Sequence, residues 1–273
     1  MGKKVDITFY NHYDRDIPEE FDNYKILVMS DLHSNEIDKD NEAVIKAVNE
    51  TEPDAVFIAG DMFSDNAKNM DVTFRLIEKL AQSYEIYYGC GNHELKLGLN
   101  ERTRRRYQDY RRKLRHAGVH YLNNKSEYIV KGNGRIKVTG LNIARKYFTK
   151  IWNKKRMPEN YIEGCVGSAG NDYNILIAHN PVYFNNYARW GADIVLSGHI
   201  HGGMIVLPII GGIISPSFEL FPHYDFGRFT AYPDNNKKSI LYLTRGLGSH
   251  TIPVRINNKP EIMLITLKKD TCT

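Results

Sequence analysis

Two histidines stand one residue apart in "VLSGHIHGG", where His199 and His201 follow an apolar run and precede a glycine pair. In an extended segment, residues i and i+2 project to the same side, so the two imidazoles can address one target. The same spacing brings Asp31 and His33 together after another apolar run. Imidazole nitrogens and carboxylate oxygens are common ligands of transition metals. The spacing therefore predicts metal chemistry at the ends of two strands.

Metal-binding residue types recur at the ends of five apolar runs, each of which reads as a buried strand. The side chains at these ends are Asp31, His33, Asp61, Asn92, His93, His179, His199 and His201. They include five of the ten histidines in the chain, which a random scatter would not place there. In α/β proteins the loops after parallel strands converge at the carboxyl edge of the sheet, where ligands bind. We therefore expect one shared site.

Seven of these side chains are predicted metal ligands. They are the oxygen donors Asp31, Asp61 and Asn92 and the imidazoles His33, His179, His199 and His201. One catalytic ion usually takes three protein ligands and a water, so seven donors exceed its needs. Two ions about 3.5–4 Å apart that share a carboxylate fit this number. Nitrogen and oxygen donors without thiolate suit Mn, Fe, Zn or Co, and two divalent ions of this kind are the predicted cofactors.

The motifs around these residues resemble those of the calcineurin-like metallophosphoesterases. They are "SDLH" (30–33), "GDMF" (60–63), "GNHE" (91–94), "AHNP" (178–181) and "SGHIH" (197–201), in the family's order. The sequence after them, as far as "NNKPEI", is similar to the YkuE/YaeI-like branch. The resemblance implies a four-layer α/β/β/α sandwich, in which two mixed sheets are flanked by helices.

The resemblance also implies a role for each site residue. It implies three ligands for a first ion (Asp31, His33 and His201), three for a second (Asn92, His179 and His199), and a bridging carboxylate, Asp61. His93 matches a histidine that binds no metal and protonates the leaving group or stabilises the transition state. Arg245, which follows "ILYLT", is predicted to grip the substrate phosphate together with Asn92 and His93.

Two features depart from the family's pattern. Glu94 stands where aspartate is commonest, at the least critical position of its motif. Members of the branch often carry an N-terminal membrane anchor, whereas "MGKKVDITFYNHYDRDIPEE" is polar and lacks the apolar core of a signal peptide. We therefore expect a cytoplasmic location, with peripheral contact to a membrane as the alternative.

The predicted reaction is hydrolysis of a phosphodiester or pyrophosphate bond. A hydroxide held between two ions would attack phosphorus, because the ions lower the pKa of bound water, and His93 and Asp61 are the predicted catalytic residues. Expected substrates are small phosphorylated compounds of the nucleotide-sugar, nucleotide or phospholipid type. Hydrolysis of phosphomonoesters or phosphoproteins at the same site, and a non-catalytic scaffold, remain alternatives.

The elements that must position these residues alternate between strands and helices. Apolar runs at 24–31, 54–61 and 84–94 are separated by helical patterns at 41–54 and 71–82. This alternation predicts parallel pairing in a sheet covered by helices. A hairpin through "KGNG" and four later strands make the second half more antiparallel.

Bulk composition limits the class of protein. The 273 residues show no repeat or linker, which predicts one domain over 1–273. The net charge of +5 is a mild excess and does not by itself imply nucleic acid. Three cysteines without CxxC spacing exclude a disulfide framework, and no apolar run reaches the roughly 18 residues of a membrane-spanning helix.

Three segments allow two interpretations each. The helix at 100–118 has arginines that form a solvated face or bind nucleic acid or an anionic membrane; the solvated face is favoured, so no nucleic-acid partner is expected. The basic and aromatic stretch 146–161 reads as an amphipathic helix, with a lid as the alternative. The apolar stretch 204–214 lines a substrate pocket or packs as a loop. The oligomeric state is not predicted.

Overall fold

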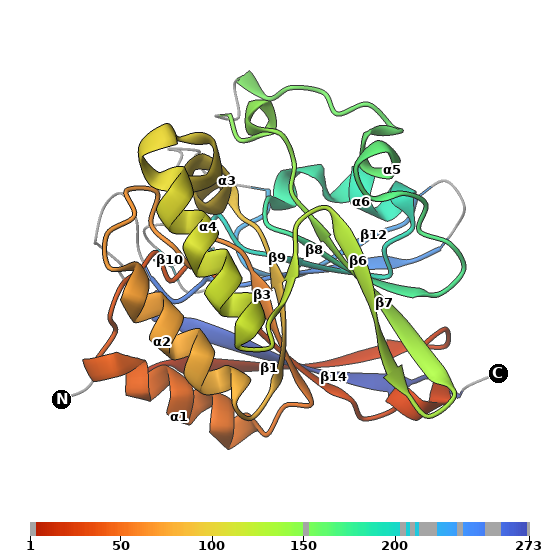
Figure 1. Cartoon of the computed structure of the whole chain (residues 1–273). Helices are drawn as coiled ribbons and strands as arrows, with labels where there is room; N and C mark the ends of the chain where they lie inside the picture. Colours follow the sequence, from red (N-terminus) through yellow and green to blue (C-terminus); the bar gives the residue numbers. More distant parts are fainter. Residues whose placement is uncertain are drawn as a thin grey trace.

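The computed structural model describes residues 4–149, 153–202, 223–233, 237–248 and 258–271, and the backbone of 206–207 and 211–212. Within them, two six-stranded sheets face each other, and helices cover the outer surface of each sheet (Figure 1). The helices α1, α2 and α4 lie on one side and α5 and α6 on the other. This arrangement confirms the predicted α/β/β/α sandwich of two mixed sheets.

The first sheet has the strand order β1-β14-β2-β3-β4-β5. Its strands are β1 (Asp6–Asp14), β2 (Lys25–Met29), β3 (Ala55–Ala59), β4 (Glu85–Gly89), β5 (His120–Leu122) and β14 (Glu261–Lys269). From β2 to β5 all pairs are parallel, whereas β14 is antiparallel to β2 and parallel to β1. The crossover helices α1 (Glu42–Thr51) and α2 (Met70–Ala81) allow the parallel pairs.

The second sheet has the order β12-β13-β9-β8-β7-β6. Its strands are β6 (Lys125–Lys131), β7 (Gly134–Leu141), β8 (Tyr173–Ala178), β9 (Ile194–Ser197), β12 (Gly227–Ala231) and β13 (Ser239–Leu243). The predicted hairpin is β6 with β7, and β12 with β13 is a second antiparallel pair. The four central strands are parallel. A short ladder of β10 (Val206–Leu207) and β11 (Gly211–Gly212) stands apart.

The other helices are α3 (Asn92–Leu99), α4 (Glu101–His116), α5 (Tyr161–Val166) and α6 (Phe184–Trp190), with 3-10 turns η1 (Glu19–Phe21), η2 (Lys39–Asn41), η3 (Arg145–Tyr147) and η5 (Pro181–Tyr183). The amphipathic helix expected at 146–161 is wrong for the described residues, because 154–160 are not helical. Pro158 lacks a backbone N–H and disfavours helix in the residue before it. Among the described helices, none has the length and hydropathy to cross a membrane.

The central strands are buried on both faces. In β2, Ile26 and Val28 pack between the two sheets, while Leu27 and Met29 pack under the helices of the first sheet. A third apolar layer lies between the second sheet and α6. Because both faces are covered, β2, β3 and β9 are apolar except at an end residue, and the polar side chains follow where these strands end. The fold thus gathers the polar residues at the strand ends.

Candidate metal centre

Loops from both sheets meet at the carboxyl ends of β2, β3, β4, β8 and β9. The backbone N–H of Asp31 donates to the Gly60 carbonyl at 3.0 Å, and that of His33 donates to the Asp61 carbonyl at 3.1 Å. The His199 N–H donates to the Asp31 carboxylate at 3.2 Å. This last contact joins the second sheet to the first, so residues from both halves of the chain share one centre.

Asp31, His33 and His201 form one group of possible metal ligands, with donor atoms within 4.8 Å of one another. Asp31 Oδ1 lies 3.7 Å from His33 Nε2 and 3.5 Å from His201 Nε2, and the two Nε2 atoms are 3.2 Å apart. The oxygen–nitrogen distances are long for hydrogen bonds. Ligand atoms about 2.1 Å from a shared ion stand roughly 3–3.5 Å apart, so the group fits a cation with small adjustments.

Asp61, His179 and His199 form a second group. His179 Nε2 lies 2.9 Å from Asp61 Oδ2 and 3.8 Å from Asp31 Oδ1. The other ring nitrogen, Nδ1, lies 2.6 Å from the Ala59 carbonyl, to which it donates in the neutral imidazole. A backbone carbonyl in this position fixes the tautomer of a metal-binding histidine, because it leaves the Nε2 lone pair free.

Asn92 adds an oxygen donor at the start of α3. Its amide oxygen is buried and has no hydrogen-bond partner among the described residues. An unsatisfied buried oxygen is costly, and a cation would satisfy it. Asp61 also groups with His33 and His93, so its carboxylate adjoins both ligand groups. Six of the seven predicted ligands therefore lie in these groups, Asn92 precedes His93, whose N–H donates to Asp61, and the donor types fit two cations.

The electrostatics of the centre favour added positive charge. Burial opposes ionisation of Asp61, but the His179 and His93 imidazoles outweigh it and hold the pKa of Asp61 well below its usual range. Burial lowers the pKa of His179, yet Asp61 and Asp31 together raise it to about 10. Burial and then the charge on His179 lower the pKa of His199 to about 3, so its lone pair stays available. A divalent cation would displace the His179 proton.

His93 lies beside Asp61 with a defined proton position. The Asp65 N–H donates to His93 Nδ1 at 3.2 Å, so the neutral ring carries its proton on Nε2. That Nε2 lies 3.8 Å from Asp61 Oδ2. The Asp65 carboxylate lies 3.7 Å from Nδ1 and 3.2 Å from the Lys96 ammonium. The neutral imidazole of His93 thus presents its N–H group on the side of Asp61.

Glu94, expected at the least critical position of its motif, accepts four hydrogen bonds. It is buried, and its Oε2 accepts from the Asp61 and Gly91 N–H groups at 2.8 and 2.9 Å. Its Oε1 accepts from the Phe63 N–H at 3.1 Å and the Tyr88 hydroxyl at 2.8 Å. Burial and the Asp61 charge raise the pKa of Glu94 to about 7. One carboxylate therefore ties the loop after β3 to the start of α3.

Left-handed backbone recurs at the candidate ligands. The φ angles are 55° at Asp31, 51° at His33, 52° at Asp61, 78° at His199 and 56° at His201. Residues with a Cβ pay about 1–2 kcal/mol for this conformation. Two glycines provide the space that the carboxylates need, because a Cβ on Gly91 or Gly198 would lie 2.2 Å from a carboxylate oxygen of Asp61 or Asp31, respectively.

Arg245 lies near the first ligand group but is held by Glu261. Its Nη2 donates to Glu261 Oε1 at 2.8 Å, and its guanidinium lies 5.5 Å from the Phe226 ring. A Cβ on Gly202 would lie 2.6 Å from Arg245 Cγ, so the arginine stem packs against the turn after His201. Contact of Arg245 with a substrate phosphate stays a prediction.

Phe148 was missed in the sequence. Its ring centre lies 5.5 Å from that of His199 and 6.4 Å from that of His179, so it borders the second ligand group. It lies in the basic and aromatic stretch 146–161, where several aromatic residues stand together and nothing in the sequence singles out this one. The stretch 204–214, whose role was left open, lies largely outside the described residues, and its side chains lie wholly outside them.

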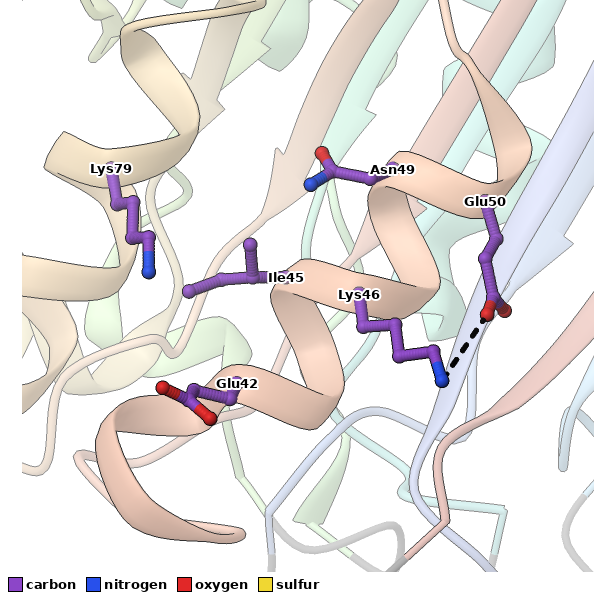
Figure 2. Close-up of a pocket in the computed structure, with 6 residues that line it drawn as sticks. All are labelled: Glu42, Ile45, Lys46, Asn49, Glu50 and Lys79. Atoms are coloured by element: carbon purple, nitrogen blue, oxygen red, sulfur yellow. Dashed lines mark ion pairs between the residues drawn. The ribbon is translucent and has the colours of Figure 1, made fainter.

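A separate groove of about 480 Å³ lies between α1 and α2 (Figure 2). Its lining residues are Glu42, Ile45, Lys46, Asn49, Glu50 and Lys79. Lys46 and Glu50 form an ion pair at 3.8 Å within it. Among the described residues, every group that could hold a metal lies at the strand ends instead. The groups that could hold a metal therefore lie apart from this groove.

Known proteins resemble this chain over the segment that contains the candidate ligands. A family model described as calcineurin-like phosphoesterase matches residues 24–203. The metallophosphoesterase YkuE of Bacillus subtilis (strain 168) is 27% identical over 257 residues, which cover 92% of this chain and 82% of that protein. Phosphodiesterase YaeI of Escherichia coli (strain K12) is 25% identical over 248 residues, covering 89% and 82%. The structure of Haemophilus influenzae NAD nucleotidase has a TM-score of 0.48 and 14% identity over 81% of this chain and 44% of that one.

Proposed function

Since the chain belongs to the calcineurin-like phosphoesterase family and is a metal-dependent phosphoric ester hydrolase, we propose that it cleaves a phosphodiester or pyrophosphate bond at a two-metal centre. The observation that carries this proposal is the position of Asp61, which groups with His179 and His199 and, separately, with His33 of the first ligand group. A carboxylate shared between two groups is the arrangement that a dinuclear site requires. The name of the relative YaeI, a phosphodiesterase, supports the choice of bond.

In the proposed centre, Asp61 would contact both ions, and each ion would have three further ligands. Asp31, His33 and His201 would hold one ion, and Asn92, His179 and His199 the other, with donors that suit Mn, Fe, Zn or Co. Two such ions, when bound, neutralise phosphoryl oxygens and activate water for in-line displacement. The protein side chains then have to orient the phosphate and manage the proton of the leaving group.

His93 is the proposed proton donor to the leaving oxygen. Its Nε2 carries the proton because Nδ1 accepts from the Asp65 N–H. A positioned general acid accelerates departure of an alkoxide by about 10²–10⁴. Asn92, His93 and Arg245 are the proposed contacts to a small phosphorylated substrate of the nucleotide-sugar, nucleotide or phospholipid type.

Elemental analysis of Asp61→Asn tests the shared carboxylate. We expect the variant to lose both metals, because one neutral amide cannot replace a bridging carboxylate, and to lose diesterase activity with them. Asp193→Asn is the matched control. Asp193 is as buried as Asp61, but it precedes β9, whereas the candidate ligands His199 and His201 follow that strand. The control should retain both metals. Full metal content in Asp61→Asn would refute the bridging role.

A substrate panel tests the bond that is cleaved. The wild-type enzyme, loaded with each metal in turn, would be assayed on a monoester, a diester, a nucleotide-sugar pyrophosphate and a phospholipid. Turnover of the diester or the pyrophosphate above that of the monoester is the expected result. Activity on the monoester alone would replace the proposal with phosphomonoesterase function.

A further inference from the structure

The positive charge of the chain is concentrated on α4. Eight basic and two acidic residues give this helix a net charge of +6. The whole chain carries +5, so all other residues together carry −1. The mild overall charge therefore conceals one strongly basic element. A charge gathered on one helix indicates a partner for that helix better than the net charge does.

The basic side chains of α4 face outward. Tyr107, Tyr110 and Leu114 are buried under the first sheet, which leaves the rest of the helix circumference to solvent. Arg106 pairs with Asp71 at 3.6 Å, and Arg112 pairs with Asp109. The exposed arginines that pair with no carboxylate among the described residues are Arg102, Arg104, Arg105 and Arg115. Like charges three or four residues apart repel, and the described carboxylates leave the charge of these four arginines unbalanced.

The shape of this face decides between partners. Its hollow, of about 510 Å³, is bounded only by side chains of α4 itself. Within the described residues, no second element lines this hollow to make a channel that could follow a nucleic-acid strand, and α4 lies across the outside of the molecule (Figure 1). The aromatic residues of α4, Tyr107 and Tyr110, are buried and offer no surface for base stacking. The outward basic side chains of this single exposed helix, called the ridge below, fit a flat anionic surface better than a nucleic-acid strand.

An apolar side chain stands at the start of the ridge. Leu99, the last residue of α3, is 59% exposed and is separated from α4 only by Asn100. Basic helices that bind membrane surfaces combine cations with apolar side chains that enter the headgroup region. Because α3 begins at Asn92 and His93, one short helix connects this surface to the proposed metal centre.

We propose that the arginine face of α4, with Leu99 at its edge, docks the protein onto an anionic lipid bilayer. Clusters of four to eight basic residues bind such surfaces by electrostatic attraction, which acts within about 10 Å at moderate salt. The interaction needs no substrate, so it stands whether or not the proposed reaction is correct.

Vesicle sedimentation tests the docking surface. Wild-type protein at about 0.15 M salt should bind phosphatidylcholine vesicles that contain roughly 30% phosphatidylglycerol and should not bind phosphatidylcholine alone. The test variant replaces four arginines by glutamine: Arg102→Gln, Arg104→Gln, Arg105→Gln and Arg115→Gln. Each basic residue strengthens binding by roughly fivefold, so the variant should bind on the order of 10²–10³-fold more weakly. Its thermal midpoint should not fall, because the changes remove repulsion.

A control of equal charge separates the helix from net charge. It removes four exposed lysines on other elements: Lys39→Gln, Lys68→Gln, Lys79→Gln and Lys131→Gln. This control should keep most of the vesicle binding, and both variants should turn over a soluble chromogenic diester at the wild-type rate. Equal binding to neutral vesicles, or equal loss in both variants, would overturn the proposal. Binding to duplex or single-stranded DNA without binding to vesicles would overturn it in favour of nucleic acid.

Discussion

At the residue scale, His93 shows how one backbone contact can assign a chemical role. The Asp65 N–H occupies Nδ1, and the proton is left on the nitrogen that faces Asp61. We expect His93→Gln to keep both metals and to lose about 10²–10⁴ in turnover of an alkyl diester. A p-nitrophenyl ester should suffer much less, because its leaving group departs without protonation. Elemental analysis and kcat for both substrates measure this.

His223→Gln is the control for this experiment, since His223 is an exposed histidine outside the ligand groups. It should leave both turnover numbers unchanged. Equal losses on the two esters in His93→Gln would exclude a role in leaving-group protonation. Loss of metal in that variant would assign His93 to the ligand set instead.

The sequence predicted residue types better than it predicted contacts. The proposed ligands could be selected because imidazoles and carboxylates at the ends of apolar runs are chemically conspicuous. Glu94 and Phe148 were missed for opposite reasons. Glu94 acts by accepting bonds mainly from backbone N–H groups, which leave no trace in residue identity. Phe148 reaches His199 from a segment far away in the chain, and spacing cannot reveal that approach.

At the scale of elements, Glu94 connects two loops through one carboxylate. Glu94→Gln exchanges one acceptor oxygen for an NH₂ donor, which opposes the donors that now bind it. We expect metal affinity to fall about 10–100-fold, as for other groups that orient metal ligands. With saturating metal, kcat should fall while KM changes little. Metal titration and steady-state kinetics measure the two effects.

Tyr88→Phe provides a graded comparison, because it removes one of the four bonds to Glu94 and leaves the loop contacts in place. Its metal affinity should lie between those of the wild type and Glu94→Gln. An unchanged metal affinity in Glu94→Gln would show that the loops keep their positions without the carboxylate.

The strand β1 has the reverse of the usual alternation between buried apolar and exposed polar side chains. In β1, His12 is fully buried, whereas Phe9 and Tyr13 are 66% and 55% exposed. Polar-inward and aromatic-outward alternation does not read as an amphipathic strand, so β1 was not predicted. The parallel centre of the second sheet was also unexpected, since strand order depends on pairings between distant segments such as β13 with β9.

At the scale of the molecule, His12 joins the two sheets. From β1 it contacts the Tyr173 hydroxyl at 2.7 Å and the Tyr242 hydroxyl at 3.0 Å, both in the second sheet. Burial, helped by the Lys238 and Arg228 charges, lowers the pKa of His12 to about 3. The unfolded chain takes up this proton below about pH 6.5, whereas the folded protein does so only near pH 3. Folding stability should therefore fall as pH decreases between these values.

The expected size of this effect is about 2 kcal/mol between pH 7.5 and pH 5, from a slope of about 1.4 kcal/mol per pH unit below pH 6.5. His12→Gln should be less stable at pH 7.5 but should lack this part of the slope. Urea unfolding at several pH values measures both quantities, and the surface variant His223→Gln should keep the wild-type slope. Parallel curves for the wild type and His12→Gln would assign the acid sensitivity to other groups.

The first and last strands of the chain pair within this architecture. β1 pairs with β14 along nine residues, so segments near both ends of the sequence belong to the same sheet. This pairing supports our proposal that the whole chain forms a single domain. The sandwich fold could be predicted from strand–helix alternation and family resemblance. The pairing of β1 with β14 could not, because it joins segments at opposite ends of the sequence and no local pattern indicates it.

The left-handed backbone at five proposed ligands has an evolutionary consequence. A ligand held at positive φ lowers stability, and glycine or asparagine would adopt the same backbone more easily. In a lineage released from selection for hydrolysis, mutations at these positions would be favoured and not merely tolerated, because they relieve strain. Descendants that have lost catalysis should then keep the apolar strands and carry small residues where the ligands stood.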